Sequence, residues 1–428
     1  MELTIKPRKS LQGTVKVPGD KSISHRSVML GSLAQGITSI KGFLMGEDCL
    51  STVKCFEAMG IDAKIQEDTV TIHGKGLHGL VEPQDVLDVG NSGTTIRLMS
   101  GILAGQLFNS VVTGDSSIRK RPMGRVTSPL KEMGATILGR NNGDLAPLTI
   151  NGGNLKPISY KTPVASAQIK SSILLAGLFS NGWTEVIEPE KSRDHSERML
   201  KYFGAEVEVD GLAARIKGYP TLLGKEIQVP GDISSAAFLL VAGAIVPDSR
   251  IIIKDVGLNP TRTGIVDVLT EMGASIKVSE TSGDTGEPIG EIIIETSNLH
   301  GVQFGGELIP RLVDEIPVLA VAAACANGIT EIRDAAELKV KESNRIEAIC
   351  RGLKQMGADI EELPDGLRIR GGKPLKGDVT LDSQGDHRIA MALAVAGFVA
   401  DKPIKINNSD SINVSFPGFN DLLDTLGN

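Results

Sequence analysis

The stretch LKYFGAEVEVDGLAARI, residues 200–216, combines the end of an amphipathic run, a glycine, and two short alternating runs that flank Asp210-Gly211. A glycine directly after the last helical turn commonly adopts a left-handed conformation. An Asp-Gly pair between two alternating runs favours a β-hairpin. The stretch therefore predicts a helix that ends at Gly204 and is followed by a hairpin.

The same pattern recurs along the whole chain. Its six copies are FEAMG (56–60), LKEMG (130–134), LKYFG (200–204), LTEMG (269–273), LKQMG (353–357) and LDTLG (423–427), with glycines 74, 70, 69, 84 and 70 residues apart. The first five copies are followed by a predicted hairpin, and a small-residue apolar helix and a strand precede each copy. Six repeats of helix, strand, helix and hairpin predict an α/β fold.

Two nearly identical segments divide the six repeats into two sets of three. VPGD occurs at residues 17–20 and again at 229–232, and each copy reads as a strand that ends in a turn. Periodicity alone is also compatible with a solenoid, but this division favours two domains. We predict a first domain of residues 20–230 and a second of residues 231–428 with 1–19. The crossings would form a hinge beside a small-molecule cleft.

Composition excludes several classes of protein. The 428 residues carry 45 Lys and Arg against 52 Asp and Glu, and only 3% are aromatic. Nucleic acid is therefore not an expected partner. No apolar stretch approaches the ~18 residues of a membrane-spanning helix, and the start does not resemble a signal peptide, so a cytoplasmic location is expected. The four cysteines and six histidines lack metal-ligand spacing, which predicts reduced thiols and no metal.

Two familiar motifs occur without the context that their chemistry needs. GKGLHG at residues 74–79 matches the dinucleotide pattern GxGxxG, but Glu82-Pro83 follows where a helix should begin. STVK at residues 51–54 matches SxxK, but its companion motifs are absent. Neither match predicts a site.

Three segments of the first half suit an anionic ligand. DKSISHR (20–26) opens a helix expected over residues 27–33, so free backbone N–H groups, Ser22, Lys21 and Arg26 could hold a phosphate or carboxylate. GNSGTTIR (90–97) takes the equivalent place in the second repeat, and RKRPMGR (119–125) concentrates four cations before a helix. Capped helices with solvated charges are the alternative.

The second half places charged residues at corresponding helix starts. Asp314-Glu315 precedes an apolar helix expected over residues 316–326, and KESNR (341–345) and DHR (386–388) precede two others. Asp314 could simply cap its helix. If the two halves close, their cations would surround a polyanionic substrate pair, and Asp314 and Glu342 would serve proton transfer.

These segments together resemble the enolpyruvyl transferase family, and within it the branch that acts on shikimate 3-phosphate. The resemblance spans nearly the whole chain. It is carried by GDKSISHR (19–26), NSGT (91–94), RPMG (121–124), SAQ (166–168), RDH (193–195), NPTR (259–262), DE (314–315), KE (341–342), Arg345 and DHR (386–388). It implies two domains, each of three βαβαββ subdomains that form an inside-out α/β barrel.

The resemblance also implies an activity. The enolpyruvyl group of phosphoenolpyruvate would pass to the 5-hydroxyl of shikimate 3-phosphate through a tetrahedral intermediate, with release of phosphate, in the shikimate pathway to chorismate and the aromatic amino acids. These two small molecules would be the partners, and no metal or organic cofactor is implied. We expect a monomer.

The family's functional residues map onto this sequence by motif. Shikimate 3-phosphate would be held by Lys21, Ser22, Arg26, Ser166, Ala167, Gln168, Arg193, Asp314 and Lys341, and phosphoenolpyruvate by Lys21, Gly93, Arg121, Gln168, Arg345 and Arg388. Asp314 would take the 5-hydroxyl proton, and Glu342 with Lys21 would protonate the methylene carbon.

Three positions bear on specificity. Ala167 stands where some relatives have a second Ser, and Val414 stands where certain members carry a Lys that contacts phosphoenolpyruvate. Gly93 leaves space beside the phosphoenolpyruvate pocket, which predicts sensitivity to glyphosate.

Other functions are compatible with parts of this pattern. The sister transferase that acts on UDP-N-acetylglucosamine shares the repeats, but it typically has a Cys before its Arg-Pro, and SSIRKRP (116–122) has none. An RNA terminal-phosphate cyclase would need nucleotide motifs. A non-catalytic scaffold that binds anions through the repeats would not need Asp314 and Glu342 to face one cleft.

Overall fold

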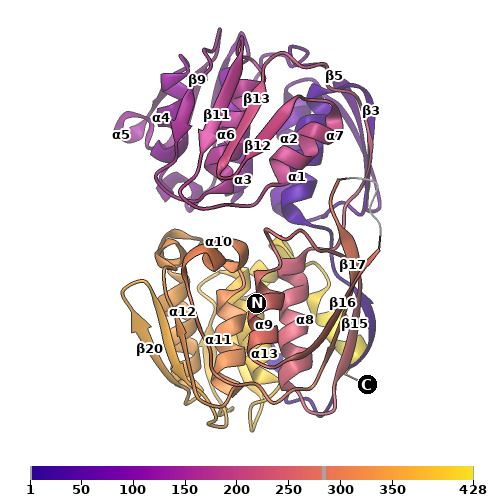
Figure 1. Ribbon diagram of the computed structural model, residues 1–428, viewed down its shortest axis with the longest axis vertical. Coiled ribbons are helices and arrows are strands. Elements are labelled where there is room, and N and C mark those ends of the chain that lie inside the picture. Colours follow the sequence, from indigo (N-terminus) through magenta and orange to yellow (C-terminus); the bar gives the residue numbers. More distant parts are fainter. Residues whose placement is uncertain (1, 282–285, 428) are drawn as a thin grey trace. The chain divides into compact units, whose positions relative to one another are not determined.

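The computed structural model describes residues 2–281 and 286–427. The chain divides into two compact units. The N-unit comprises residues 19–229 and 284–287, and the C-unit comprises residues 1–18, 230–283 and 288–428. Figure 1 shows that each unit contains both helices and sheets, and each has its own hydrophobic core.

The N-unit contains three four-stranded sheets in the orders β14-β3-β5-β4, β6-β7-β9-β8 and β10-β11-β13-β12. The strands are β3 (Gln35–Lys41), β4 (Asp62–Gln66), β5 (Thr69–Lys75), β6 (Leu87–Asp88), β7 (Asn109–Thr113), β8 (Thr136–Gly139), β9 (Leu145–Asn151), β10 (Ser159–Lys161), β11 (Trp183–Ile187), β12 (Val207–Asp210), β13 (Ala213–Lys217) and β14 (Glu226–Gln228). The helices are α1 (Lys21–Leu33), α2 (Glu47–Ala58), α3 (Gly93–Ala104), α4 (Gly124–Glu132), α5 (Arg140–Gly143), α6 (Ala167–Gly177) and α7 (His195–Phe203), with the short η1 (Ile118–Lys120).

The C-unit contains two four-stranded sheets, β16-β17-β15-β2 and β18-β19-β21-β20, and the three-stranded sheet β1-β23-β22. The strands are β1 (Glu2–Ile5), β2 (Gln12–Lys16), β15 (Arg250–Gly257), β16 (Ser275–Thr281), β17 (Ile289–Glu295), β18 (Gln303–Phe304), β19 (Ile329–Ile332), β20 (Asp359–Leu363), β21 (Gly366–Arg370), β22 (Thr380–Asp382) and β23 (Ile404–Asn407). The helices are α8 (Ile233–Ile245), α9 (Gly264–Glu271), α10 (Ile309–Leu312), α11 (Ile316–Cys325), α12 (Arg345–Gln355), α13 (His387–Gly397) and α14 (Phe419–Leu426), with η2 (Gly306–Leu308), η3 (Ala336–Val340) and η4 (Ser409–Val414).

The five predicted hairpins are confirmed. They are β4–β5, β8–β9, β12–β13, β16–β17 and β20–β21, and each pair is antiparallel. The glycine before each hairpin has a positive φ: 86° at Gly60, 110° at Gly134, 106° at Gly204, 88° at Gly273 and 83° at Gly357. Only a residue without a Cβ adopts this conformation readily, which explains why glycine ends these helices.

The sixth repeat differs because its copy of the pattern has no hairpin after it. Gly427 has a φ of −100° and follows α14, the last helix in the described part of the chain. The N-terminal strand β1 pairs antiparallel with β23 instead, with Glu2 opposite Asn407. The start of the chain therefore takes the place that a hairpin strand has in the other five sheets.

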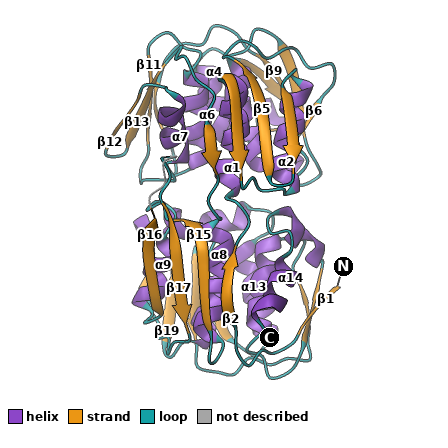
Figure 2. Cartoon of the chain, turned by 90° about the vertical axis from the view of Figure 1, so that its right-hand side faces the viewer, coloured by secondary structure: helices purple, strands orange, loops and turns teal. Residues whose placement is uncertain are grey.

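Three helices of each unit are buried almost completely, and the sheets lie outside them (Figures 1 and 2). In the N-unit these are α1, α3 and α6, and in the C-unit α8, α11 and α13. Their small residues let the helices approach closely. A Cβ on Gly101 of α3 would lie 2.1 Å from the carbonyl oxygen of Ser172 on α6. This arrangement brings the starts of several helices together in each unit.

One predicted helix boundary is wrong in a way that matters for the site. The helix expected over residues 27–33 begins at Lys21, because the Asp20 carboxylate accepts a hydrogen bond from the Ile23 backbone N–H at 2.9 Å and caps the helix there. Lys21 and Ser22 therefore lie in the first turn of α1. Arg26 lies in the second turn and points into the unit.

The structure also bears on the cysteines and on membrane insertion. None of the four cysteines, all of which lie in the described residues, forms a disulfide bond, and burial raises the pKa of Cys55 and of Cys325 to about 12. Within the described residues, no helix is both long and apolar enough to cross a bilayer. Nor do the described side chains form a group of three or more His, Cys, Asp or Glu that could hold a metal ion.

Candidate active site

The predicted site residues fall into two groups, one in each unit. Those of the N-unit are Lys21, Ser22, Arg26, Gly93, Arg121, Ser166, Ala167, Gln168 and Arg193, and those of the C-unit are Asp314, Lys341, Glu342, Arg345 and Arg388. Most of them lie in or just before the first turns of α1, α3, α6, α7, α11, α12 and α13.

Arg26 is a buried cation that neutral groups hold. Its side chain lies on α1 and the residue is only 4% exposed. Its guanidinium donates to the hydroxyls of Ser196 at 2.7 Å and Ser171 at 2.8 Å, and to the Ser22 carbonyl at 2.9 Å. Burial lowers the pKa of Arg26 to about 10, against the opposing effects of Glu197 and Asp20. A cation fixed in this way by neutral acceptors can attract an anion.

Lys21 lies beside Arg26 in the first turn of α1. Its ammonium is 2.6 Å from the Asp48 carboxylate on α2, and about a fifth of its side chain remains exposed. Asp48 therefore fixes the direction of Lys21 while leaving part of it accessible. Asp48 was not among the residues predicted for the site.

Gly93, Arg121 and Gln168 belong to a second cluster in the N-unit, which also contains Arg97. Arg97 donates to the Gln168 side-chain oxygen at 2.9 Å, and Arg121 donates to Asn91 at 2.9 Å. A Cβ at position 93 would lie 2.9 Å from an Arg121 nitrogen and 3.1 Å from an Arg97 nitrogen. Glycine at the start of α3 thus makes room for two guanidinium groups.

Buried side chains fix the start of α3 relative to α1 and α2. His25 Nδ1 lies 2.7 Å from the Thr52 hydroxyl, which lies 2.7 Å from the Thr95 hydroxyl, which donates to Ser92 at 2.6 Å. Ser92 caps α3 directly before Gly93. Burial lowers the pKa of His25 to about 3, so the imidazole is neutral at pH 7. These hydrogen bonds connect α1 and α2 to the turn that contains Gly93.

The remaining N-unit residues lie close by. Ser166 directly precedes α6, and Ala167 and Gln168 form the first turn of that helix. Arg193 is partly exposed in the loop before α7, and its charge contributes to the lowered pKa of Arg26. Ser166, Ala167 and Arg193 therefore lie at the starts of the two helices whose hydroxyls hold Arg26.

Arg345 organises the group in the C-unit. Its side chain is 1% exposed and makes hydrogen bonds to Asp386 at 2.8 Å, Asp314 at 3.1 Å and Glu342 at 2.6 Å. Burial alone would lower the pKa of Arg345, but Asp386, Glu342 and Asp314 outweigh it and raise the pKa. Arg345 was predicted to contact phosphoenolpyruvate, yet the structure surrounds it with carboxylates. An anion would have to displace one of them to reach it.

Asp314 also lies close to other cations. Its Oδ1 atom is 3.8 Å from Arg388 Nε and 4.0 Å from Lys341 Nζ, and its carbonyl accepts from Arg388 at 3.4 Å. Glu315, not Asp314, takes the N-cap position of α11, and no side chain caps that helix. Asp314 is therefore not a helix cap. It is a carboxylate with three cations within 4.0 Å of its Oδ1 atom.

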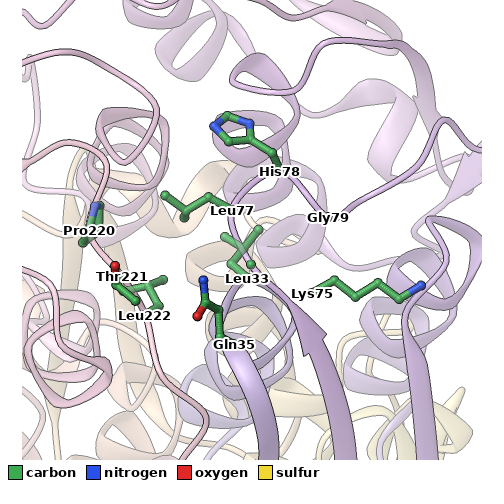
Figure 3. A pocket seen from close by; sticks show the side chains of 10 residues that line it. Leu33, Gln35, Lys75, Leu77, His78, Gly79, Pro220, Thr221 and Leu222 are labelled. Atoms are coloured by element: carbon green, nitrogen blue, oxygen red, sulfur yellow. The ribbon is translucent and has the colours of Figure 1, made fainter.

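The N-unit also contains a pocket, which Figure 3 shows. Its volume is about 390 Å³, and Gly76, Leu77, His78 and Gly79 of the GxGxxG match line it. None of the predicted site residues does. A Cβ on Gly74 would lie 2.2 Å from the Gly31 carbonyl oxygen of α1, so that glycine allows close packing. No helix follows β5 before α3, so the dinucleotide motif is not formed.

The partners that hold the predicted residues were not predicted from the sequence. Asp48 fixes Lys21, Arg97 donates to Gln168, and Asp386 holds Arg345. Only Asp386 had a local signal, because an Asp before an apolar helix is typical of an N-cap, and Asp386 does cap α13.

Comparisons with known proteins agree on one family. The model of the family described as EPSP synthase (3-phosphoshikimate 1-carboxyvinyltransferase) matches residues 5–423. A 3-phosphoshikimate 1-carboxyvinyltransferase of Desulforamulus reducens is 60% identical over 99% of both chains, and one of Bacillus cytotoxicus is 57% identical over 99% of both. The structure of an EPSP synthase from Acinetobacter baumannii is 46% identical with a TM-score of 0.90, and the alignment covers 100% of this chain and 98% of that one.

These findings confirm the predicted family and the inside-out α/β fold class. They disfavour the sister transferase and the non-catalytic scaffold, because relatives that share more than half of their residues carry one enzyme name. The chain belongs to the EPSP synthase (3-phosphoshikimate 1-carboxyvinyltransferase) family.

Proposed function

We propose that this protein transfers the enolpyruvyl group of phosphoenolpyruvate to the 5-hydroxyl of shikimate 3-phosphate and releases phosphate. This is a step of the shikimate pathway. The observation that carries the proposal is the arrangement around Arg345, where one buried guanidinium holds Asp314 at 3.1 Å and Glu342 at 2.6 Å. An addition and elimination needs one group to accept a proton and another to donate one.

Asp314 is suited to accept the proton of the 5-hydroxyl. Arg345, Arg388 and Lys341 keep positive charge within 4.0 Å of its Oδ1 atom. An ionised carboxylate can take a proton from a hydroxyl in hydrogen-bond reach as that oxygen attacks carbon.

Glu342 is suited to deliver a proton to the methylene carbon of phosphoenolpyruvate. It is more exposed than Asp314, and its contact with Arg345 is the one that an incoming anion could replace. A carboxyl group that carries a proton can deliver it to that carbon as a general acid. Addition then gives a tetrahedral ketal phosphate, and loss of phosphate with a methyl proton restores the vinyl group.

The N-unit supplies cations for the phosphates and the carboxylates. Arg26 and Arg193 lie near the starts of α6 and α7, and Lys21 lies at the start of α1. We assign this cluster to shikimate 3-phosphate, and Arg121, Gly93 and Gln168 to phosphoenolpyruvate. Arginine suits both groups because its planar fork binds carboxylate and phosphate with two hydrogen bonds.

We further propose that the N-unit and the C-unit are the two functional domains, and that a single chain is the active form. The N-unit binding residues and the C-unit carboxylates would have to act on one pair of substrates. No step of this chemistry requires a metal or an organic cofactor.

Phosphate release tests the function directly. We expect the purified protein to release phosphate from phosphoenolpyruvate with shikimate 3-phosphate and not with UDP-N-acetylglucosamine, in buffer that contains EDTA. Release with the nucleotide sugar alone would assign the chain to the sister activity. Release with neither acceptor, by protein that is folded by circular dichroism, would contradict the proposal.

Gly93→Ala tests the second N-unit cluster. The new Cβ would lie 2.9 Å from Arg121, so this flexible guanidinium must move while the backbone stays in place. We expect the KM for phosphoenolpyruvate to rise roughly tenfold, because small misplacements of a binding group weaken alignment. The inhibition constant for glyphosate should rise as well.

Gly153→Ala is the matched control. Apart from its chain neighbours, no atom of the described residues lies within 4 Å of a Cβ at that position, and its φ is not in the left-handed region. We expect its kinetic constants to equal those of the wild type. A Gly93→Ala protein with unchanged KM and unchanged inhibition constant would refute the steric account.

A further inference from the structure

Lys170 is a buried cation that the chemistry above does not use. It lies on α6 with a side chain that is 2% exposed, and its ammonium is 2.7 Å from Glu188 and 2.8 Å from Glu197. Both carboxylates are buried as well. Removing three charges from water is costly even when they are paired. A charged cluster that is buried at this cost indicates a role beyond packing.

The two carboxylates flank the loop that carries Arg193. Glu188 directly follows β11, and Glu197 lies in the first turn of α7. Glu188 also accepts a hydrogen bond from the Ser192 backbone N–H at 3.3 Å. The Lys170 ammonium thus connects the two ends of the loop. Glu188 also binds the backbone N–H of Ser192 within the loop, next to Arg193.

The triad also lies directly beside the groups that hold Arg26. Ser171 follows Lys170 on α6, and Ser196 precedes Glu197 on α7, and their hydroxyls lie 2.6 Å apart. Both hydroxyls accept from Arg26. The ion pair between Lys170 and Glu197 therefore joins α6 and α7 next to the two hydroxyl groups that accept from Arg26.

We propose that Lys170, Glu188 and Glu197 are positioning residues that hold Arg193 and Arg26 for the phosphate group of the sugar substrate. This inference rests on the proposed function in that shikimate 3-phosphate is the ligand. The triad acts through the two arginines and does not touch the substrate. A purely structural triad would affect stability and leave substrate affinity unchanged.

Glu188→Gln tests the proposal with the smallest change. The amide oxygen can still accept from Lys170 and Ser192, but the ionic attraction is lost. We expect the KM and the calorimetric dissociation constant for shikimate 3-phosphate to rise about 10- to 100-fold. The kcat at saturation and the KM for phosphoenolpyruvate should stay within about twofold of the wild type.

Glu185→Gln is the matched control for this change. Glu185 lies on β11 and accepts from the exposed Ser159 hydroxyl. The same substitution there should leave the affinity for shikimate 3-phosphate unchanged.

The double variant Lys170→Met/Glu188→Gln separates positioning from charge. The wild-type triad has a net formal charge of −1. The double variant has the same net charge, carried by Glu197. We expect weaker binding of shikimate 3-phosphate and at least about tenfold faster hydrogen exchange at the Ser192 and Arg193 amides, because the loop is no longer held. If this variant does not fold, Glu197→Gln replaces it with the same expected loss of affinity and faster exchange.

Two results would overturn the proposal. One is a lowered melting temperature in Glu188→Gln with a dissociation constant for shikimate 3-phosphate within about twofold of the wild type, which is what a structural role predicts. The other is wild-type affinity in the folded double variant. Wild-type protein that binds shikimate 3-phosphate without turnover would instead contradict the proposed function, and hydrogen exchange would still test the triad.

Discussion

Asp314→Asn is expected to abolish most of the turnover while the protein stays folded. A general base typically contributes roughly 10²–10⁴-fold to a rate, so we expect kcat to fall by that factor. The amide oxygen of Asn can still accept the hydrogen bond that Arg345 donates to Asp314 at 3.1 Å. The KM for shikimate 3-phosphate should therefore change by less than about tenfold.

Steady-state phosphate release and calorimetric binding of shikimate 3-phosphate measure the two parts of this expectation. Asp421→Asn on α14 is the control, because that residue is exposed and lies in the first turn of a helix of the same unit. The control should keep wild-type kinetics. Turnover of Asp314→Asn close to the wild-type value would remove Asp314 from the role of base.

The repeats were predictable because their signals are local. A C′ glycine and an Asp-Gly turn act within a few residues, so the five hairpins follow from short stretches such as residues 200–216. The start of α1 was placed six residues too late, although Asp20 is a capping residue type. The Pro-Gly turn at residues 18–19 and the polar residues that follow it are typical of a loop, so the first turns of the helix were not predicted.

The support of the site was not predictable in the same way. Arg26 and Arg345 were expected to offer their charges to a ligand, yet both are buried. The partners that bury Arg26 lie 145 and 170 residues away, and Asp386 lies 41 residues from Arg345. Contacts over such separations depend on how the repeats pack. Residue types at helix starts predicted which side chains lie at the site, but not which of them form hydrogen bonds or ion pairs with one another.

Arg345→Met is expected to have the largest effect on stability. It would leave the buried Asp386 carboxylate, with Asp314 and Glu342, without the cation that holds all three. Removing one partner of a buried ion pair typically costs about 3–5 kcal/mol. We expect a loss of this size in the free energy of unfolding at pH 7, measured by urea titration with circular dichroism.

The loss should shrink as the pH falls. In the wild type, burial raises the pKa of Asp386, but Arg345 outweighs it and the pKa is lowered. This carboxylate therefore stabilises the fold above its unfolded pKa of about 3.9, and that stability is lost as the pH falls through the lower native value. Without Arg345, burial dominates and raises the native pKa, so the variant gains stability when Asp386 takes up a proton.

Arg333→Met is the control for Arg345→Met. Arg333 also lies near two carboxylates, Glu331 and Asp365, but its side chain is 41% exposed. Exposed pairs contribute about 0–1 kcal/mol, so this variant should lose little stability. The double variant Arg345→Met/Asp386→Asn should recover part of the loss, because it removes the most deeply buried of the three charges. Equal losses in Arg345→Met and Arg333→Met, or a gap that widens between pH 7 and pH 5, would show that Arg345 does not organise the carboxylates of the C-unit.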